Sequence, residues 1–146
     1  MNEEELLEKA IAIAVNAHQG QKDRYNSPYI LHPLRVMARL DSATEKIVGI
    51  LHDVVEDTDW TFDQLSREGF PATILSALEC VTKKEGEEYE AFVKRSARDP
   101  VARRVKLADL EDNMDLRRMP QATDQDLPRL QKYVKAWRFL KELRDP

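Results

Sequence analysis

The stretch Leu51-His52-Asp53-Val54-Val55-Glu56-Asp57-Thr58 places four side chains that can bind a metal or carry a proton within six residues. The residues just before it, 47–51, are mostly apolar, which is typical of a helix in a protein core. Carboxylates in such surroundings are costly unless they are paired or bound to a metal. Because residues i and i+4 share one face of a helix, Glu56 is expected beside His52. Asp57 is likewise expected beside Asp53, so that one face carries a metal-ligand pair and, one turn later, an acid/base pair.

The length and composition predict one globular domain. A chain of 146 residues can bury a sizeable core, so residues 1–146 are expected to form a single domain. Hydrophobic residues make up 42% and charged residues 34%, which is the balance of a soluble protein. The formal net charge of -4 argues against a global nucleic-acid surface. Cys80 is the only cysteine, which excludes an internal disulfide.

Neither secretion nor membrane insertion is indicated by the sequence. The chain starts with the acidic run Met1-Asn2-Glu3-Glu4-Glu5, which is unlike a signal peptide. No apolar run approaches the roughly 20 residues of a membrane span. We therefore expect a cytoplasmic protein whose partner is a small molecule, with no nucleic acid and no membrane. The sequence does not indicate an oligomeric state.

Helical periodicity runs from end to end and predicts an all-α domain of about seven or eight helices. Thr44 is expected to cap the helix that carries His52-Asp53. Other helix starts are expected at capping or proline signals, namely Asn2 with Glu5, Pro33, Thr61 with Gln64, Pro71, Glu87, Asp99-Pro100 and Asp126. The helix after Pro100 is expected to end near Leu110. The last helix has one apolar face, made of Leu130, Tyr133, Val134, Trp137 and Leu140, and its aromatic residues are assigned to the core.

Three separated segments present side chains of the metal-ligand type. They are His32 just before Pro33, the pair His52-Asp53, and Asp109 in an otherwise apolar stretch. Two imidazoles and two carboxylates suit a borderline-to-hard divalent ion such as manganese, iron, zinc or magnesium. The absence of a cysteine from this set argues against a structural zinc site.

This set of residues indicates phosphoryl chemistry. A bound divalent ion lowers the pKa of its water and polarises a phosphoryl oxygen. Glu56 and Asp57 are placed to orient that water or to take its proton. Asn113, one turn after Asp109, can donate a hydrogen bond to a phosphate or a sugar hydroxyl without adding charge.

Several segments in a fixed order resemble the hydrolase domain of Rel/Spo-type alarmone enzymes, within the HD phosphohydrolase superfamily. They are Ala17-His18-Gln19-Gly20-Gln21, Pro28-Tyr29-Ile30-Leu31-His32-Pro33, Leu51–Thr58, Val81-Thr82-Lys83, Val105-Lys106-Leu107-Ala108-Asp109 and Asp112-Asn113-Met114. The resemblance extends from about residue 10 to residue 116. The length is similar to that of the small stand-alone, Mesh-like hydrolases, and the chain is too short for the family's synthetase domain as well.

The resemblance implies a ligand set and a reaction. One manganese ion would be held by His32, His52, Asp53 and Asp109. The pair Glu56-Asp57 would act on the attacking water. The implied reaction is the attack of metal-bound water that removes the 3′-pyrophosphate from guanosine tetra- or pentaphosphate, the alarmone of the stringent response.

The resemblance also implies contacts with the substrate. Asn113 would contact the ribose and phosphate region. Arg24 stands where the family has a lysine and keeps a phosphate-binding cation. Lys83 is a candidate phosphate contact, with an interaction with the helix dipole as its alternative, and Lys22 is a candidate with a plain surface position as its alternative.

The chain departs from the family pattern at residues that recognise the substrate. Asp23 replaces the arginine that stacks on guanine, and a carboxylate cannot stack but can accept hydrogen bonds from a base amine or a sugar hydroxyl. Asn26 replaces a glycine and tolerates the left-handed region. Asp115-Leu116 stands where the family often has Arg-Thr. Two alternatives therefore stay open: an HD-family nucleotide phosphatase with another substrate, an adenine alarmone or NADPH, and a non-catalytic alarmone sensor.

Overall fold

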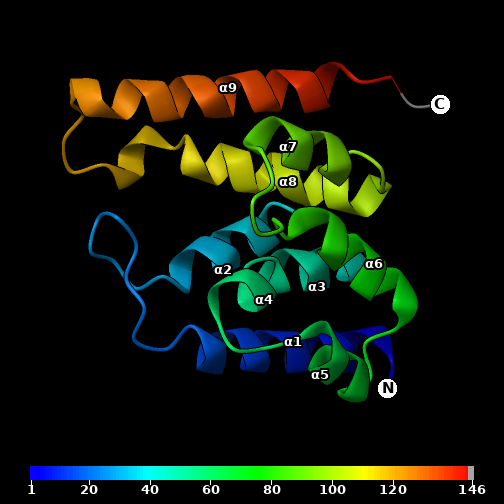
Figure 1. The fold of residues 1–146 in the computed structure, drawn as a ribbon. Coiled ribbons are helices and arrows are strands. Elements are labelled where there is room, and N and C mark those ends of the chain that lie inside the picture. Colours follow the sequence, from blue (N-terminus) through cyan, green and yellow to red (C-terminus); the bar gives the residue numbers. More distant parts are fainter. Residues whose placement is uncertain (145–146) are drawn as a thin grey trace.

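The computed structural model describes residues 1–144, and the regular elements of this part of the chain are all helices, which confirms the all-α prediction (Figure 1). The helices are α1 (Glu3–Ala17), α2 (Leu31–Ala38), α3 (Ala43–Leu51), α4 (Val54–Asp57), α5 (Phe62–Arg67), α6 (Ala72–Val81), α7 (Tyr89–Ser96), α8 (Pro100–Asn113) and α9 (Leu127–Glu142), with 3-10 turns η1 (Leu116–Arg118) and η2 (Asp124–Asp126). Within these residues the only β-type pairing is an isolated bridge between Lys22 and Pro28. None of the helices in residues 1–144 is long and apolar enough to cross a bilayer.

Helix α3 lies at the centre of the main core. It packs against α1, α2, α6 and α8, and its residues Ile47 to Leu51 are all buried. A helix that is apolar on every side belongs in an interior, because it has no face suited to water. Gly49 allows close packing at this point, since a Cβ atom there would lie only 2.6 Å from Leu40 Cδ1. The ligand-bearing end of α3 is therefore held on several sides.

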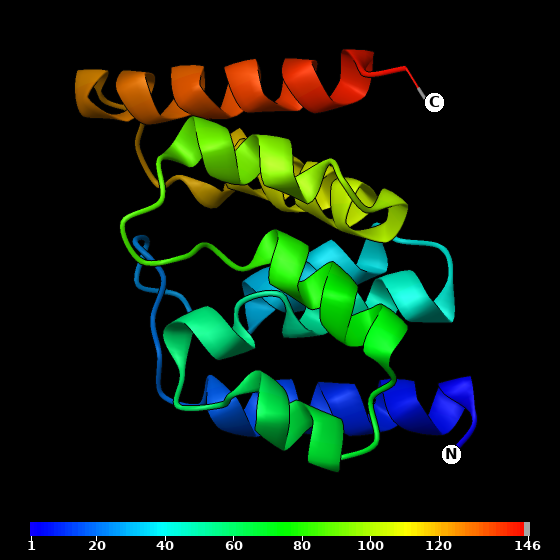
Figure 2. The same ribbon diagram turned by 45° about the vertical axis from the view of Figure 1, so that its right-hand side comes forward.

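A second, smaller core joins α7, α8 and α9. Its buried members are Val93, Leu110, Ala136 and Leu140. Figures 1 and 2 both show α9 as the outermost layer on one side, with α7 and α8 beneath it and α1 on the opposite side of the molecule. Helix α8 therefore belongs to both cores and connects α9 with the central helices.

Several predicted helix starts are confirmed. Asn2 accepts from the backbone N–H of Glu5 at 2.8 Å, the Thr61 side chain caps α5 with Gln64 as its partner, and Asp99 caps α8. The predicted cap of α3 is wrong, because Ser42 occupies that position and Thr44 lies inside the first turn. Ser42 has an extended backbone and exchanges two hydrogen bonds with Glu45, which satisfies two N–H groups that the helix leaves free.

Three further boundaries differ from the sequence prediction. The helix expected to carry His52-Asp53 is interrupted there, since α3 ends at Leu51 and α4 begins at Val54, and this break brings the described part of the chain to nine α-helices. Helix α7 is shorter than expected, while α8 continues to Asn113. On α9, Val134 is 45% exposed and does not belong to the apolar face predicted for that helix.

The cap of α3 yields a stability prediction. Ser42→Ala should lower the free energy of unfolding by about 1 kcal/mol, because the substitution leaves the Glu45 N–H without its acceptor. Thr44→Ala is the matched control and should have little effect. Urea unfolding of the two variants measures the difference, and a larger loss in Thr44→Ala would contradict the assigned cap.

Candidate metal centre and substrate pocket

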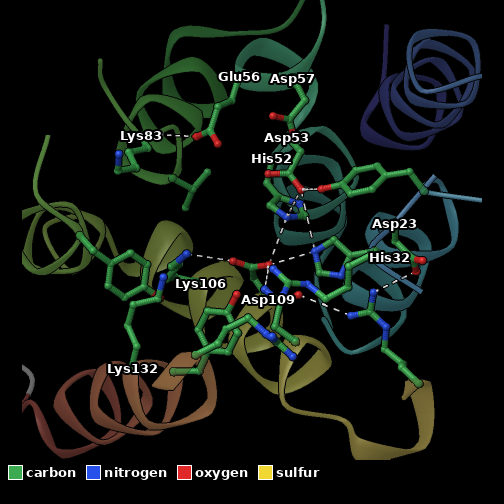
Figure 3. A pocket seen from close by; sticks show the side chains of 18 of the residues that line it. Asp23, His32, His52, Asp53, Glu56, Asp57, Lys83, Lys106, Asp109 and Lys132 are labelled. Carbon is green, nitrogen blue, oxygen red and sulfur yellow. Dashed lines mark hydrogen bonds and ion pairs between the residues drawn. The ribbon is translucent and has the colours of Figure 1, made fainter. Parts of the chain in front are cut away.

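Four predicted ligand side chains converge from three parts of the fold. His32 comes from the first turn of α2, His52 and Asp53 from the break between α3 and α4, and Asp109 from α8 (Figure 3). The Nε2 atom of His32 lies 2.9 Å from Asp109 Oδ1, and the Nε2 atom of His52 lies 3.5 Å from the same oxygen. Asp53 Oδ2 lies 3.0 Å from His52 Nε2 and 3.8 Å from His32 Nε2.

These spacings suit a single small cation. Ligand atoms at about 2.1 Å from a metal and at right angles to one another lie about 3 Å apart. The observed separations between these nitrogen and oxygen atoms run from 2.9 to 3.8 Å. The donor set of two imidazoles and two carboxylates, without thiolate, therefore fits a divalent ion of the manganese or zinc type in both chemistry and size.

His52 provides independent support for a cation in this position. Its Nδ1 donates to the Gly49 carbonyl at 2.6 Å, so Nε2 carries the lone pair of the neutral ring. This Nε2 is buried and makes no hydrogen bond, although Asp53 lies close to it. A buried polar atom without a partner is costly. The nitrogen is thus oriented for a ligand that the side chains themselves do not supply.

The pKa values of the candidate ligands are shifted by the charged groups packed around them. Burial alone would lower the pKa of His52, but the Asp53 and Asp109 carboxylates outweigh it and raise that pKa well above its usual value. Burial would raise the pKa of Asp109, but the Lys106 ammonium and the His32 ring hold it well below its usual value. The carboxylates thus favour a positive charge at this point, and a divalent ion can supply that charge while the His52 ring stays neutral.

Asp112 supports His32 from behind, a role that we did not predict from the sequence. Its side chain is fully buried, and Oδ2 accepts a 2.6 Å hydrogen bond from His32 Nδ1. Arg35 and Arg118 also donate to this carboxylate, at 2.8 and 3.1 Å. A carboxylate on the far nitrogen of a ligating histidine fixes the tautomer and the ring orientation. The signal was present in the sequence, because Asp112 is three residues from Asp109 on one helix.

Two other neighbours of the ligands were missed. Lys106 is buried and donates to Asp109 Oδ2 at 2.9 Å, while its ammonium lies 4.7 Å from the centre of the Phe92 ring. Tyr29 donates a hydrogen bond to Asp53 Oδ2. Lys106 thus leaves the other Asp109 oxygen, Oδ1, facing the two histidines. On Asp53 the same Oδ2 accepts from Tyr29 and lies near both histidine rings.

The acid pair lies at the edge of the cluster, with Asp57 beside Asp53 as expected from the sequence. Ligand atoms of Asp53, Glu56 and Asp57 all lie within 4.8 Å of one another, whereas His52 groups with His32 and Asp109. Glu56 was expected beside His52, and the break after Leu51 is the reason that it lies beside Asp53. Glu56 Oε1 accepts from the backbone N–H of Lys83 at 2.9 Å. Burial and the Asp53 and Glu56 carboxylates raise the pKa of Asp57 to about 6.

The cluster opens into a cavity of about 390 Å³. The cavity is lined by the acid pair and by the four residues predicted to bind substrate, which are Lys22, Arg24, Lys83 and Asn113. Asn113 donates to Asp109 Oδ1 at 3.1 Å, so its amide is fixed beside the ligand set. One chamber therefore contains the candidate metal site, the acid pair and several cations.

Asp23 has a structural role that the sequence analysis did not assign to it. Its carboxylate accepts from the backbone N–H groups of Tyr25 and Ser27, both at 2.9 Å, and from Arg118 at 3.3 Å. Burial opposes these contacts, but the amides and Arg118 outweigh it and lower the pKa of Asp23. Asn26 adopts the expected left-handed conformation, with φ at 66°. Asp23 thus holds the loop in place at the cavity wall.

Helix α9 and the 3-10 turn η1 contribute residues that the sequence analysis did not assign to the site. Arg118, Arg129, Lys132 and Tyr133 all line the cavity. Tyr133 also packs against the smaller core, as predicted, so it has both roles. A signal was available, because residues 129, 132 and 133 share one face of a helix.

The role of Asp112 gives a prediction for metal affinity. Asp112→Asn should weaken manganese binding about 10- to 100-fold, because His32 loses the anionic acceptor that orients its ring. Isothermal titration of the metal-free protein measures the change. Asp124→Asn, at the exposed turn η2, is the control, and unchanged affinity in Asp112→Asn would contradict this role.

The raised pKa of Asp57 gives a prediction for stability. The folded, metal-free protein keeps this proton to about pH 6, whereas the unfolded chain loses it near pH 4, so its stability falls as the pH rises through that window. Asp57→Asn should therefore match the wild type near pH 4 and exceed it by roughly 1 kcal/mol at pH 8, a value reduced for solvent screening. Urea unfolding in EDTA at the two pH values tests this. An equal difference at both would be inconsistent with the raised pKa.

No protein-family model matches the chain, but curated proteins and a solved structure do. The chain is 34% identical over 122 residues to the guanosine-3′,5′-bis(diphosphate) 3′-pyrophosphohydrolase of Aquifex aeolicus, a match that covers 75% of this chain and 17% of that protein. It is 38% identical over 122 residues to the GTP pyrophosphokinase of Streptomyces coelicolor, with 74% and 14% covered. The chain thus spans less than a fifth of the length of these relatives.

The structural comparison covers nearly the whole chain. A metazoan ortholog of SpoT, described as hydrolysing ppGpp and as having a role in starvation responses, superposes with a TM-score of 0.76. The match covers 94% of this chain and 85% of that one, at 24% sequence identity, and it supports the shared fold. In sequence the chain is similar to one segment of Rel/Spo-type proteins, and in fold it is similar to the SpoT ortholog, which together support an HD domain of the Rel/Spo type.

Proposed function

We propose that this chain is a metal-dependent phosphohydrolase that removes the 3′-pyrophosphate from a guanosine bis(diphosphate)-like nucleotide. The observation that carries the proposal is the convergence of His32, His52, Asp53 and Asp109 in one cavity that also contains an acid pair and several cations. The name of the Aquifex relative supports the same reaction class.

The same four residues are proposed to hold one divalent cation, with manganese as the ion. Their mixed nitrogen and oxygen donors and the absence of thiolate favour such an ion. When bound, the cation supplies a Lewis acid for a phosphoryl oxygen and lowers the pKa of nearby water. Asp112 and Lys106 keep the ligands His32 and Asp109 in position.

Glu56 and Asp57 are the proposed catalytic pair. They would orient the attacking water and accept its proton. A carboxylate with a pKa of about 6, as in Asp57, can serve as a proton acceptor near neutral pH. Glu56 Oε1 accepts from the Lys83 N–H, which leaves Oε2 free for the attacking water.

The proposed reaction balances without a further reactant. The water oxygen forms a bond to the phosphorus next to the ribose, the bond from that phosphorus to the 3′-oxygen breaks, and pyrophosphate leaves. The ribose 3′-oxygen must gain a proton, while the acid pair takes one from the water. Asn113 is the proposed donor to the sugar region, and Arg24 and Lys83 balance the charge of the departing phosphates.

The roles of the ligands and of the base can be separated by substitution. His52→Ala and Asp109→Ala should abolish both manganese binding and turnover, because each removes a ligand. Glu56→Gln should keep the metal and lose rate by about 100-fold or more, because the geometry survives without the base. Metal content and pyrophosphate release are measured on the same samples, and full activity in Glu56→Gln would refute its role.

A substrate screen tests the function itself. Purified protein with manganese would be offered guanine and adenine 3′-pyrophosphates, NADPH and simple nucleotides. Release of pyrophosphate from the guanine compound is the expected result. Preference for an adenine compound or NADPH would favour a phosphatase with another substrate, and tight binding without turnover would favour an alarmone sensor.

A further inference from the structure

The cavity is lined by side chains of both charges. The carboxylates around the candidate metal centre are Asp53, Glu56, Asp57 and Asp109. The lining also includes Lys22, Arg24, Lys83 and Lys132, and within residues 1–144 none of these four side chains makes an ion pair with an acid. The protein as a whole has more acids than cations, 27 against 23. Unpaired cations are therefore concentrated in this cavity, although the protein as a whole has a net negative charge.

Lys132 is the most informative of these cations. It extends from α9, and Figure 3 shows it on the other side of the Asp109 cluster from Glu56 and Asp57. Its ammonium lies 4.4 Å from the centre of the Tyr89 ring and 5.4 Å from that of Tyr133. Aromatic faces hold an ammonium in place without neutralising it. Lys132 is thus positioned by the structure while its charge stays available.

Other cations near Lys132 increase the local positive charge. Burial and the cations Lys106, Arg24, Arg129 and Lys83 together lower the pKa of Lys132. Lys106 and Arg129 have acid partners at 2.9 and 3.1 Å, namely Asp109 and Asp126, whereas Lys132 and Arg24 have none within the described chain. A group of like charges in a cavity attracts an anion that relieves their repulsion.

We propose that Lys132 is a specificity-determining residue that provides a second phosphate subsite for the end of the nucleotide remote from the cleaved bond. This inference rests on the proposed function, in which the cleaved phosphate binds at the candidate metal centre. The substrate class is then a nucleotide with phosphoryl groups at two ends, the 3′ chain at the His/Asp cluster and a 5′ diphosphate at Lys132. A nucleotide with phosphates at only one end would leave either the His/Asp cluster or Lys132 without a phosphoryl group.

The first test compares substrates and two matched variants. Lys132→Gln removes the charge and keeps much of the side chain. Lys135→Gln makes the same change on the same helix, at a residue outside this cavity whose side chain is 80% exposed. With manganese, kcat and KM would be measured for guanosine 3′-diphosphates that carry two, one or no phosphoryl groups at the 5′ position.

The expected result is selective. Lys132→Gln should raise KM about tenfold for the 5′-diphosphate compound, in line with the loss of one charge-assisted contact, and leave kcat within about twofold. The compound without a 5′ phosphate should bind the variant and the wild type alike, and Lys135→Gln should behave as the wild type. An equal rise in KM for all three compounds, or none, would overturn the proposal.

The second test does not depend on hydrolysis. GDP and GMP would be titrated into the metal-free protein in EDTA. Lys132→Gln should weaken GDP binding about tenfold and GMP binding less, whereas Lys135→Gln should leave both unchanged. If both variants bind GDP like the wild type, the subsite is refuted while the hydrolase proposal stands. If no 3′-diphosphate is cleaved but GDP binding still depends on Lys132, the hydrolase proposal fails and the anion site is supported.

Discussion

The burial of several carboxylates inside the helical domain is the constraint on which the rest of the structure depends. Asp109 and Asp112 are buried on one face of α8, and Asp53 lies beside them at the start of α4. Buried carboxylates are stable only with partners of opposite charge or with hydrogen bonds. The positions of His32 and Lys106 follow from this requirement. The arrangement leaves one shared space between the side chains, and that space is the candidate metal site.

The sequence predicted the fold class and most helix starts because those signals are local, whereas the candidate ligands were identified by their residue types and by the resemblance of their segments to a known family. Capping pairs such as Asn2 with Glu5 and Thr61 with Gln64 depend on neighbours three residues apart, so they could be recognised directly. The cap of α3 was misassigned because Ser42 and Thr44 are both suitable capping residues. Only the backbone conformation at Ser42 distinguishes them.

The break at His52-Asp53 could not be predicted in the same way. Consecutive residues on an uninterrupted helix point about 100° apart. Both side chains face one cavity because α3 ends and α4 begins there, and the cause is tertiary: α2 and α8 bring His32 and Asp109 to this point. The contributions of α9 were missed for a related reason. Lys132 and Tyr133 lie about 80 residues from the His-Asp pair, and only the packing of α9 over α7 and α8 brings them to the site.

The hydrogen bond from His52 to the Gly49 carbonyl links a site residue to the central helix α3. That carbonyl belongs to the helix whose close approach to Leu40 leaves no room for a side chain at residue 49. The rotational freedom of the imidazole is therefore lost when the polypeptide first folds, and an arriving ion meets a donor that is already oriented. Occupancy of the metal site should then depend on the integrity of α3 as much as on the ligand atoms themselves.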